Sequence, residues 1–237
     1  MRSHHIVYQA HAFDFWLARA AIVLIAGLQL LFVNPNLILG GRWLAPGVEI
    51  ALLVPLSFAT ALTQRRARQA SEDHHWTALR RHRKFIRYMA LLLTAVAMAI
   101  NLDSLFSVTK ALLFSGAKGP SGQSLLLDAL NIWFTNVVIF TLWYWNLDRG
   151  GPAARGLGHG DKPDFLFPQM VGTGDETPGW TPGFIDYFYV SFTNATAFSP
   201  TDTMPLTARS KLLMAVQAMV SLLTVGLVAA RAVNILS

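Results

Sequence analysis

The residues that could carry chemistry gather in a short polar segment near the carboxyl end of the chain. The hydroxyl groups of Thr196, Ser199 and Thr201 and the carboxylate of Asp202 lie between an aromatic stretch (184–195) and a long apolar stretch that begins at residue 206. Serine, threonine, aspartate and proline are ordinary turn and helix-capping residues, so the segment can be a plain helix–helix turn. It is also the candidate functional element of the chain.

The region 184–236 resembles the pore loop and inner helix of the potassium-channel superfamily, over about a fifth of the chain. In that family a short pore helix ends in a threonine-rich filter. A turn that contains proline then leads to an inner helix with a small, arginine-bearing end. The ungapped match places residues 191–196 (SFTNAT) at the pore-helix end, 197–202 (AFSPTD) at the filter, 205–209 (PLTAR) at the turn and 227–231 (LVAAR) at the inner-helix end.

The filter position departs from the family pattern. Ser199 and Thr201 stand where the filter glycines would be, and Pro200 stands where the aromatic residue would be. Proline has a fixed φ and no N–H, and a β-branched threonine rarely adopts positive φ, so a cage of inward-pointing carbonyls is not expected here. The filter-equivalent residues are Thr196, Ala197, Phe198, Ser199, Pro200, Thr201 and Asp202, and the polar pore-helix residues are Thr193 and Asn194.

The resemblance therefore implies a wide, hydrated pathway and passive, weakly selective permeation of monovalent cations, without potassium selectivity. Thr196, Ser199, Thr201 and Asp202 would line the constriction, while Phe198 and Pro200 would shape it. One pore loop cannot enclose a pathway, and the resembling family closes it with four copies, which implies a homotetramer. The alternative is a non-conducting membrane scaffold or partner subunit that retains the channel fold. Phe198 or inner-helix residues such as Met214 and Met219 would then seal the constriction.

The composition predicts a polytopic helical membrane protein. The chain has 237 residues, 53% of them hydrophobic and 14% charged, with a mean hydropathy of +0.41. It has no cysteine, and its first 15 residues lack the pattern of a cleaved signal peptide. The net charge of +6 comes from basic residues that flank apolar stretches, which favours anionic lipid headgroups over nucleic acid as partners. We expect an integral membrane protein, with a bacterial inner membrane as its location.

Five stretches approach the roughly 20 apolar residues that a membrane span needs: 15–33, 44–62, 88–115, 124–145 and 206–236. The third is either one long tilted helix or two pieces that break near Asp103. We expect an all-α bundle of about five spans with a re-entrant pore helix. We divide the chain into two parts. Residues 1–123 form the N-terminal transmembrane helices, and residues 124–237 form a channel-like pore domain. The pore domain consists of an outer helix (124–147), a linker (148–183), a pore loop (184–205) and an inner helix (206–236). In the outer helix, Asn131 and Asn136 are candidates for hydrogen bonds to the inner helix.

Residues 64–88 form a basic segment that we interpret as a membrane-surface helix. Arginines and a lysine recur on one helical face at spacings of three and four residues. A voltage-sensing helix needs apolar residues between its charges, whereas Arg81 and His82 occupy those positions here. The residues predicted to contact lipid headgroups are Arg80, Arg83, Lys84 and Arg87.

No pattern indicates catalysis, a metal site or a cofactor. Asp186 and Asp202 stand without a histidine in the last 78 residues, so no acid–base pair or nucleophile accompanies them. The clustered histidines have no acidic or cysteine companions at ligand spacing. We therefore expect a protein that is not an enzyme.

The charge distribution and the resemblance disagree about orientation. If residues 64–88 are cytoplasmic in a five-span chain, fifteen of the 19 basic residues lie inside, and only Arg42, Lys110, Lys118 and Arg231 lie outside. The positive-inside rule then places the pore loop on the cytoplasmic side, whereas the resemblance places it outside. An inverted pore domain, as in ionotropic glutamate receptors, a sixth crossing or re-entry after Asp103, or insertion against the charge rule would each reconcile them.

Overall fold

The computed structural model describes residues 2–32, 46–47, 50–51, 54, 73–114, 122–155, 162–171, 180–196 and 202–236. This part of the chain is mostly helical, as the sequence predicted. The long elements are α1 (Arg2–Phe32), α3 (Asp73–Phe114), α4 (Gly122–Leu147), α6 (Phe184–Thr196) and α7 (Ala208–Leu236). The short elements are η2 (Asp148–Gly150), α5 (Pro152–Arg155), β1 (Phe165–Leu166), η3 (Pro168–Met170) and β2 (Met204–Pro205).

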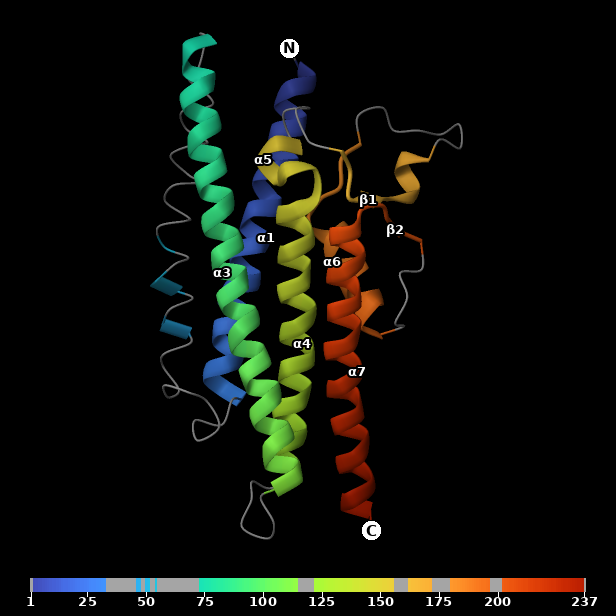
Figure 1. The fold of residues 1–237 in the computed structure, drawn as a ribbon. Helices are drawn as coiled ribbons and strands as arrows, with labels where there is room; N and C mark the ends of the chain where they lie inside the picture. The colour runs from blue at the N-terminus through green and yellow to red at the C-terminus, as the bar shows by residue number, and fades with distance from the viewer. Residues whose placement is uncertain are drawn as a thin grey trace.

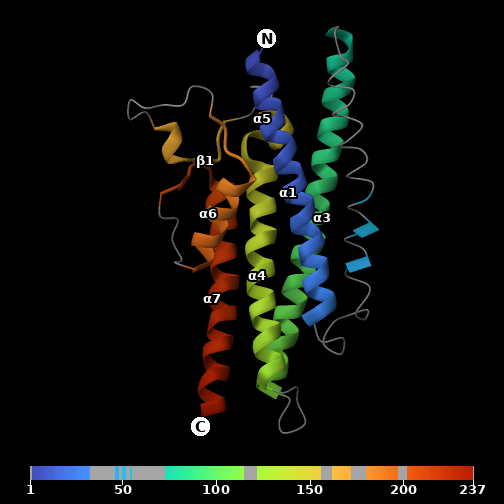
Figure 2. The same ribbon diagram turned by 180° about the vertical axis from the view of Figure 1, so that it is seen from behind.

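Helix α4 is the centre of the bundle. It packs against α1, α3, α6 and α7, and the two opposite views show these helices arranged around it (Figures 1 and 2). Within its apolar window, 72% of the residues are buried, against 28% to 33% for α1, α3 and α7. The other long helices therefore leave much of their apolar surface exposed, as helices in contact with lipid do.

Four described helices are long and apolar enough to cross a membrane, over Phe13–Leu31, Lys84–Leu113, Gln123–Gly150 and Ala208–Ala229. The amino ends of α1, α3 and α7 lie at the same end of the bundle as the carboxyl end of α4 (Figure 1). We call this the α4-end. Helices α1 and α3 run in the same direction, so α3 begins at the end of the bundle opposite to the one where α1 ends. The span predicted over 44–62 falls almost wholly outside the described residues.

Helix α3 is continuous, which decides between the two arrangements that the sequence allowed. Its 42 residues run past Asp103 without interruption, and the segment contains neither glycine nor proline. Thr94 and Ser104 donate hydrogen bonds to the carbonyls of Ala90 and Ile100 within the same helix, at 2.8 and 3.0 Å. These polar side chains are thus satisfied inside the helix and do not break it. No re-entry or extra crossing begins at Asp103.

A short β-bridge connects the linker to the chain before α7. β1 pairs antiparallel with β2, with Phe165 opposite Pro205 and Leu166 opposite Met204. The N–H of Leu206 also donates to the carbonyl of Asp164 at 2.8 Å. This pairing is the single sheet of the described residues, and it fixes where the chain enters α7.

Aromatic side chains fill the core at the α4-end. Trp145 contacts the rings of Phe15 and Phe184 edge-on, with centroids 5.2 and 5.7 Å apart. Phe165 of β1 contacts the rings of Tyr144 and Tyr187 at 5.1 and 6.3 Å. The linker therefore packs its aromatic residues onto α4 and α6 and closes this end of the bundle.

Candidate site between α4, α6 and α7

Helix α6 reaches only partway along the bundle. Its 13 residues span about 20 Å at 1.5 Å per residue. It begins beside Asp14 at the α4-end and extends along α7 as far as Met214 and Gln217, which Asn194 contacts. The chain is back at the α4-end by Leu206, where it enters α7 (Figure 1).

Gln217 of α7 is the hub that joins the three helices. Its amide oxygen accepts hydrogen bonds from the hydroxyl of Tyr144 at 2.6 Å and from Asn194 Nδ2 at 2.9 Å. Its Nε2 donates to the carbonyl and to the Oγ of Ser191, at 2.9 and 2.7 Å. The Ser191 hydroxyl in turn donates to the carbonyl of Val137 on α4 at 2.7 Å. All these side chains are buried, and each has a hydrogen-bond partner within the group, as buried polar side chains need.

A second contact between α4 and α7 confirms one prediction. Asn136 Nδ2 donates to the carbonyl of Gln217 at 3.3 Å and to Ser221 Oγ at 3.0 Å. The other predicted asparagine, Asn131, accepts a bond from Thr135 on its own helix. Of the two asparagines of α4, Asn136 thus makes the expected bond to α7.

Two aspartates hold the amino end of α6. Asp14 of α1 accepts a 3.1 Å bond from the N–H of Phe184, and Asp186 accepts a 2.7 Å bond from the N–H of Gly183. There is little room for a side chain at Gly183, because a Cβ there would lie 3.2 Å from Asp14 Oδ1. Partial burial raises the pKa of Asp186, and the nearby charge of Asp14 raises it further, while the bond from Gly183 lowers it. The N–H groups and the partial positive charge at the amino end of the helix offset part of this penalty.

Three arginines cap the carboxyl end of α4. Arg155 Nη1 donates to the carbonyls of Trp145 and Asp148, both at 2.8 Å. Arg87 donates from Nε to Asn146 and from Nη2 to Leu147, and Arg209 Nη2 also donates to Leu147. Terminal carbonyls of a helix lack intrahelical partners and carry partial negative charge, so the three guanidinium groups stabilise this end.

Two buried carboxylates tie the linker to this cap. Asp148 accepts a bond from the hydroxyl of Tyr187 and a 2.7 Å bond from the N–H of Asp164. Asp164 forms a bidentate ion pair with Arg209 and accepts a 2.6 Å bond from the Thr207 hydroxyl. The chain before α7 is thereby fixed to the end of α4.

The Arg155 guanidinium stacks on the Tyr187 ring, 4.9 Å from its centroid. Burial raises the pKa of Tyr187 well above its usual range, and the Asp148 charge adds to the effect while Arg155 opposes it. Burial also lowers the pKa of Arg155, although the charges of Tyr187 and Asp148 oppose the shift. Both side chains therefore pair with groups on the end of α4 in a largely water-free setting.

Of the seven residues predicted to line the pathway, the structure describes two, Thr196 and Asp202. Ala197, Phe198, Ser199, Pro200 and Thr201 lie outside the described residues. Thr196 is exposed at the end of α6, where its hydroxyl donates to the carbonyl of Phe192 at 2.9 Å, and Asp202 is exposed near the start of α7.

The two residues predicted as polar residues of a pore helix, Thr193 and Asn194, make different contacts in α6. The Thr193 hydroxyl donates to the carbonyl of Tyr189 within α6 at 2.8 Å. Asn194 is buried and bonds to α7 through Met214 and Gln217. Met214 is buried as well, whereas Met219 is 64% exposed, so of these two methionines only Met219 faces outward.

The predicted lipid-contact residues lie on α3. Lys84 is exposed, and Arg87 is half-buried with protein carbonyls as partners. The side chains of Arg80 and Arg83 lie outside the described residues, although the backbone there continues α3 without a break.

Sequence reasoning missed Gln217, Tyr144 and Ser191, although α7 carries a signal. Buried polar residues recur along it at spacings of three, four or seven residues, as on a helix face that packs against protein: Ser210, Gln217, Ser221 and Thr224. An amphipathic pattern of this kind within an apolar helix marks the side that faces the bundle.

Among the described residues, no group of histidine, cysteine, aspartate or glutamate side chains could hold a metal ion. Comparisons with protein-family models, curated proteins and solved structures gave no match.

Proposed function

We propose that this chain is one subunit of a homotetrameric, weakly selective channel for monovalent cations in a bacterial inner membrane. Its pore-forming unit would be α6, residues 197–201 and α7. The observation that carries the proposal is that α6 stops partway along the bundle. Buried hydrogen bonds hold it there, from Asn194 to Gln217 and from Gln217 to Ser191.

The depth at which α6 ends supports the proposal. Asn194 contacts Met214 and Gln217, six and nine residues after the start of the apolar window of α7 at Ala208. At 1.5 Å per residue this is about 9 to 14 Å into the membrane. Non-helical backbone at such a depth is tolerated where protein buries it or water surrounds it, because lipid cannot satisfy its polar groups. The end of α6 thus requires a polar environment inside the membrane.

The electrostatics of this end favour a cation. The carboxyl end of a helix carries partial negative charge, and the exposed Thr196 stands there. Asp202 is exposed where the chain returns, and four copies of its carboxylate would form a ring that attracts cations. The mouth of the pathway would therefore be acidic.

The exposed surface of α7 supports assembly of several copies. One α6–α7 unit cannot surround a pathway alone, and only 28% of the apolar window of α7 is buried in the single chain. Its large exposed side chains are Leu212, Met219, Leu222, Leu223 and Val225. In a tetramer, part of this surface would contact the neighbouring subunits.

The same surface gives weight to a second candidate, a non-conducting scaffold or partner subunit. The outward side chains named above are all apolar, so they supply no continuous polar lining. A scaffold would use α6 and α7 to bind partners within the membrane, and it would need no polar pathway.

A flux assay on proteoliposomes separates the two candidates. Potassium, sodium and a large organic cation are compared for the wild type, for Asp202→Asn and for the control Asp103→Asn on α3. A channel predicts cation flux that falls with Asp202→Asn and persists with Asp103→Asn. Replacement of Ser199-Pro200-Thr201 by Gly-Tyr-Gly should shift flux toward potassium. Absence of flux from folded, reconstituted protein would favour the scaffold.

A further inference from the structure

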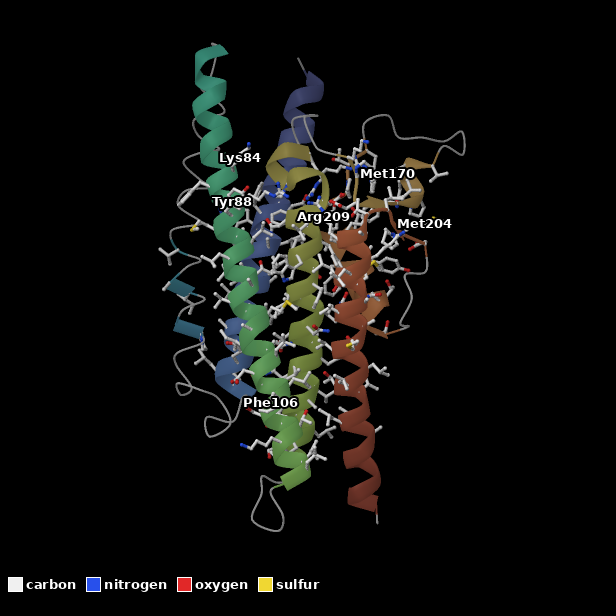
Figure 3. All side chains as sticks on the ribbon, viewed as in Figure 1. Lys84, Tyr88, Phe106, Met170, Met204 and Arg209 are labelled. Carbon is white, nitrogen blue, oxygen red and sulfur yellow. The ribbon has the colours of Figure 1, made fainter. Side chains whose placement is uncertain are left out.

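Two arginines from different helices share one acceptor at the α4-end. Arg87 of α3 and Arg209 of α7 each donate from Nη2 to the carbonyl oxygen of Leu147, both at 3.3 Å. Their Nη2 atoms are thus no more than twice 3.3 Å apart. Figure 3 shows Lys84 and Tyr88 on α3 and Arg209 on α7, all at this end of the bundle.

The pair lies where a bilayer would present its headgroups. Arg87 is the fourth residue of the apolar window Lys84–Leu113, and Arg209 is the second residue of the window Ala208–Ala229. Leu147 lies three residues before the end of the window of α4 at Gly150. Three membrane-length helices therefore place these groups at one membrane boundary. Tyr88 is 64% exposed beside them, as aromatic residues at membrane interfaces often are.

Arg87 has spare capacity to bind an anion. A guanidinium group has five N–H donors, and Arg87 uses one for Asn146 and one for Leu147. Across the part of the chain that the structure describes, its other three donors have no acceptor, and no carboxylate lies within ion-pair distance of it. Among the described residues, the hydrogen-bond partners of Arg87 are the carbonyls at the end of α4.

The surrounding charges also favour an anion. The side chain of Arg209 is 47% exposed although it pairs with Asp164. Lys84 is exposed one helical turn before Arg87 on the same face. The partial negative charge at the end of α4 opposes an anion, but Arg155 already donates to two of its carbonyls from the buried side.

We propose that Arg87 and Arg209, with Lys84 at the rim, bind the phosphate of an anionic phospholipid headgroup. Guanidinium groups match phosphate oxygens with paired hydrogen bonds, which suits two arginines that converge on one point. A free phosphate ion has the same chemistry, but the depth of the pair at a membrane boundary favours the lipid. This site does not depend on whether the protein conducts ions.

The test uses the purified full-length chain in detergent and measures its melting temperature during titration with phosphatidylglycerol, phosphatidylcholine or inorganic phosphate. Phosphatidylglycerol should raise the melting temperature and phosphatidylcholine should not, because a ligand that binds the folded state stabilises it. Arg87→Gln should weaken the response to phosphatidylglycerol by about fivefold or more, the effect of one basic residue at an anionic surface. The control Lys110→Gln, near the opposite end of α3, should respond like the wild type.

Two results would overturn the assignment. One is a wild-type response of Arg87→Gln to phosphatidylglycerol, and the other is equal stabilisation by inorganic phosphate, which would make the site one for a soluble anion. If Arg87→Gln does not fold, Arg87→Lys takes its place, since lysine keeps the charge but lacks the paired donors. A weakened response supports the site, and an unchanged one overturns it.

Discussion

The hydroxyl of Tyr144 on α4 donates a 2.6 Å hydrogen bond to the amide oxygen of Gln217 on α7. Both side chains are fully buried, and the same oxygen accepts a bond from Asn194 of α6. One carboxamide thus fixes the relative positions of three helices. Helix association in a membrane gains little from the hydrophobic effect, so interhelical hydrogen bonds such as these help to orient the helices.

Replacement of Gln217 by leucine should destabilise the bundle. Gln217 takes part in four side-chain hydrogen bonds, and membrane-buried bonds contribute about 0.6 kcal/mol each on average, so a loss of about 2 kcal/mol is expected. Unfolding in mixed detergent micelles measures this loss of stability. Tyr144→Phe removes one of the four bonds and should cost about a quarter as much. A Gln217→Leu variant as stable as the wild type would show that this contact does not hold the helices.

Gly151→Ala should destabilise the protein, while Gly226→Ala should not. Gly151 has φ +92°, and a Cβ there would lie 3.0 Å from the carbonyl oxygen of Asn146. Together with its ψ of 174°, this is a backbone region essentially restricted to glycine, where another residue costs about 1–3 kcal/mol before any clash. Gly226 lies within α7 with nothing within 4 Å of such a Cβ, so alanine should be neutral or stabilise by up to about 1 kcal/mol. Paired melting curves test the difference, and equal effects of the two substitutions would contradict it.

The stability of the protein should carry a pH dependence from Asp186. Burial and the charge of Asp14 raise the pKa of this carboxyl in the folded protein, so the folded state binds the proton more tightly than the unfolded state. The associated stability is present below the ordinary pKa of 3.8 and is lost as the pH rises through the raised value.

Melting temperatures of the wild type and Asp186→Asn between pH 4 and pH 7 measure this effect. Asparagine keeps an oxygen for the Gly183 N–H but does not ionise, so the wild type should lose stability relative to the variant as the pH rises. Lys162→Gln, on the linker, should retain the wild-type dependence. Parallel curves for the wild type and Asp186→Asn would rule out this role of Asp186.

The helices were predictable from the sequence because their determinants are local. Apolar length predicted α1, α4 and α7, and aromatic residues followed by a polar turn predicted α6. The continuity of α3 was not predictable, because Asn101, Asp103 and Ser104 suggest a break. In the structure, Ser104 donates a hydrogen bond within its own helix and Asn101 is buried. The residue types alone do not reveal either feature.

The candidate site was predictable only in part, since its contacts join residues far apart in sequence. The bond from Asn136 to α7 could be expected because a polar residue in an apolar helix needs a partner. The ion pair between Asp164 and Arg209 could not, because Asp164 lies in a linker without periodicity and 45 residues from its partner. Nor does any pattern indicate that Arg155 would cap α4.

The unbroken α3 also has a mechanical consequence. At 1.5 Å per residue its 42 residues extend about 63 Å, twice the thickness of the hydrocarbon core of a bilayer. Arg87 rests on the end of α4, about 21 Å from Asp73 and about 40 Å from Phe114. Past Arg87 the helix is held against α4, because Leu105, Val108 and Ala111 share a buried cluster with Leu125 and Ile132 of α4. The shorter basic arm instead projects beyond the end of α4 (Figure 1).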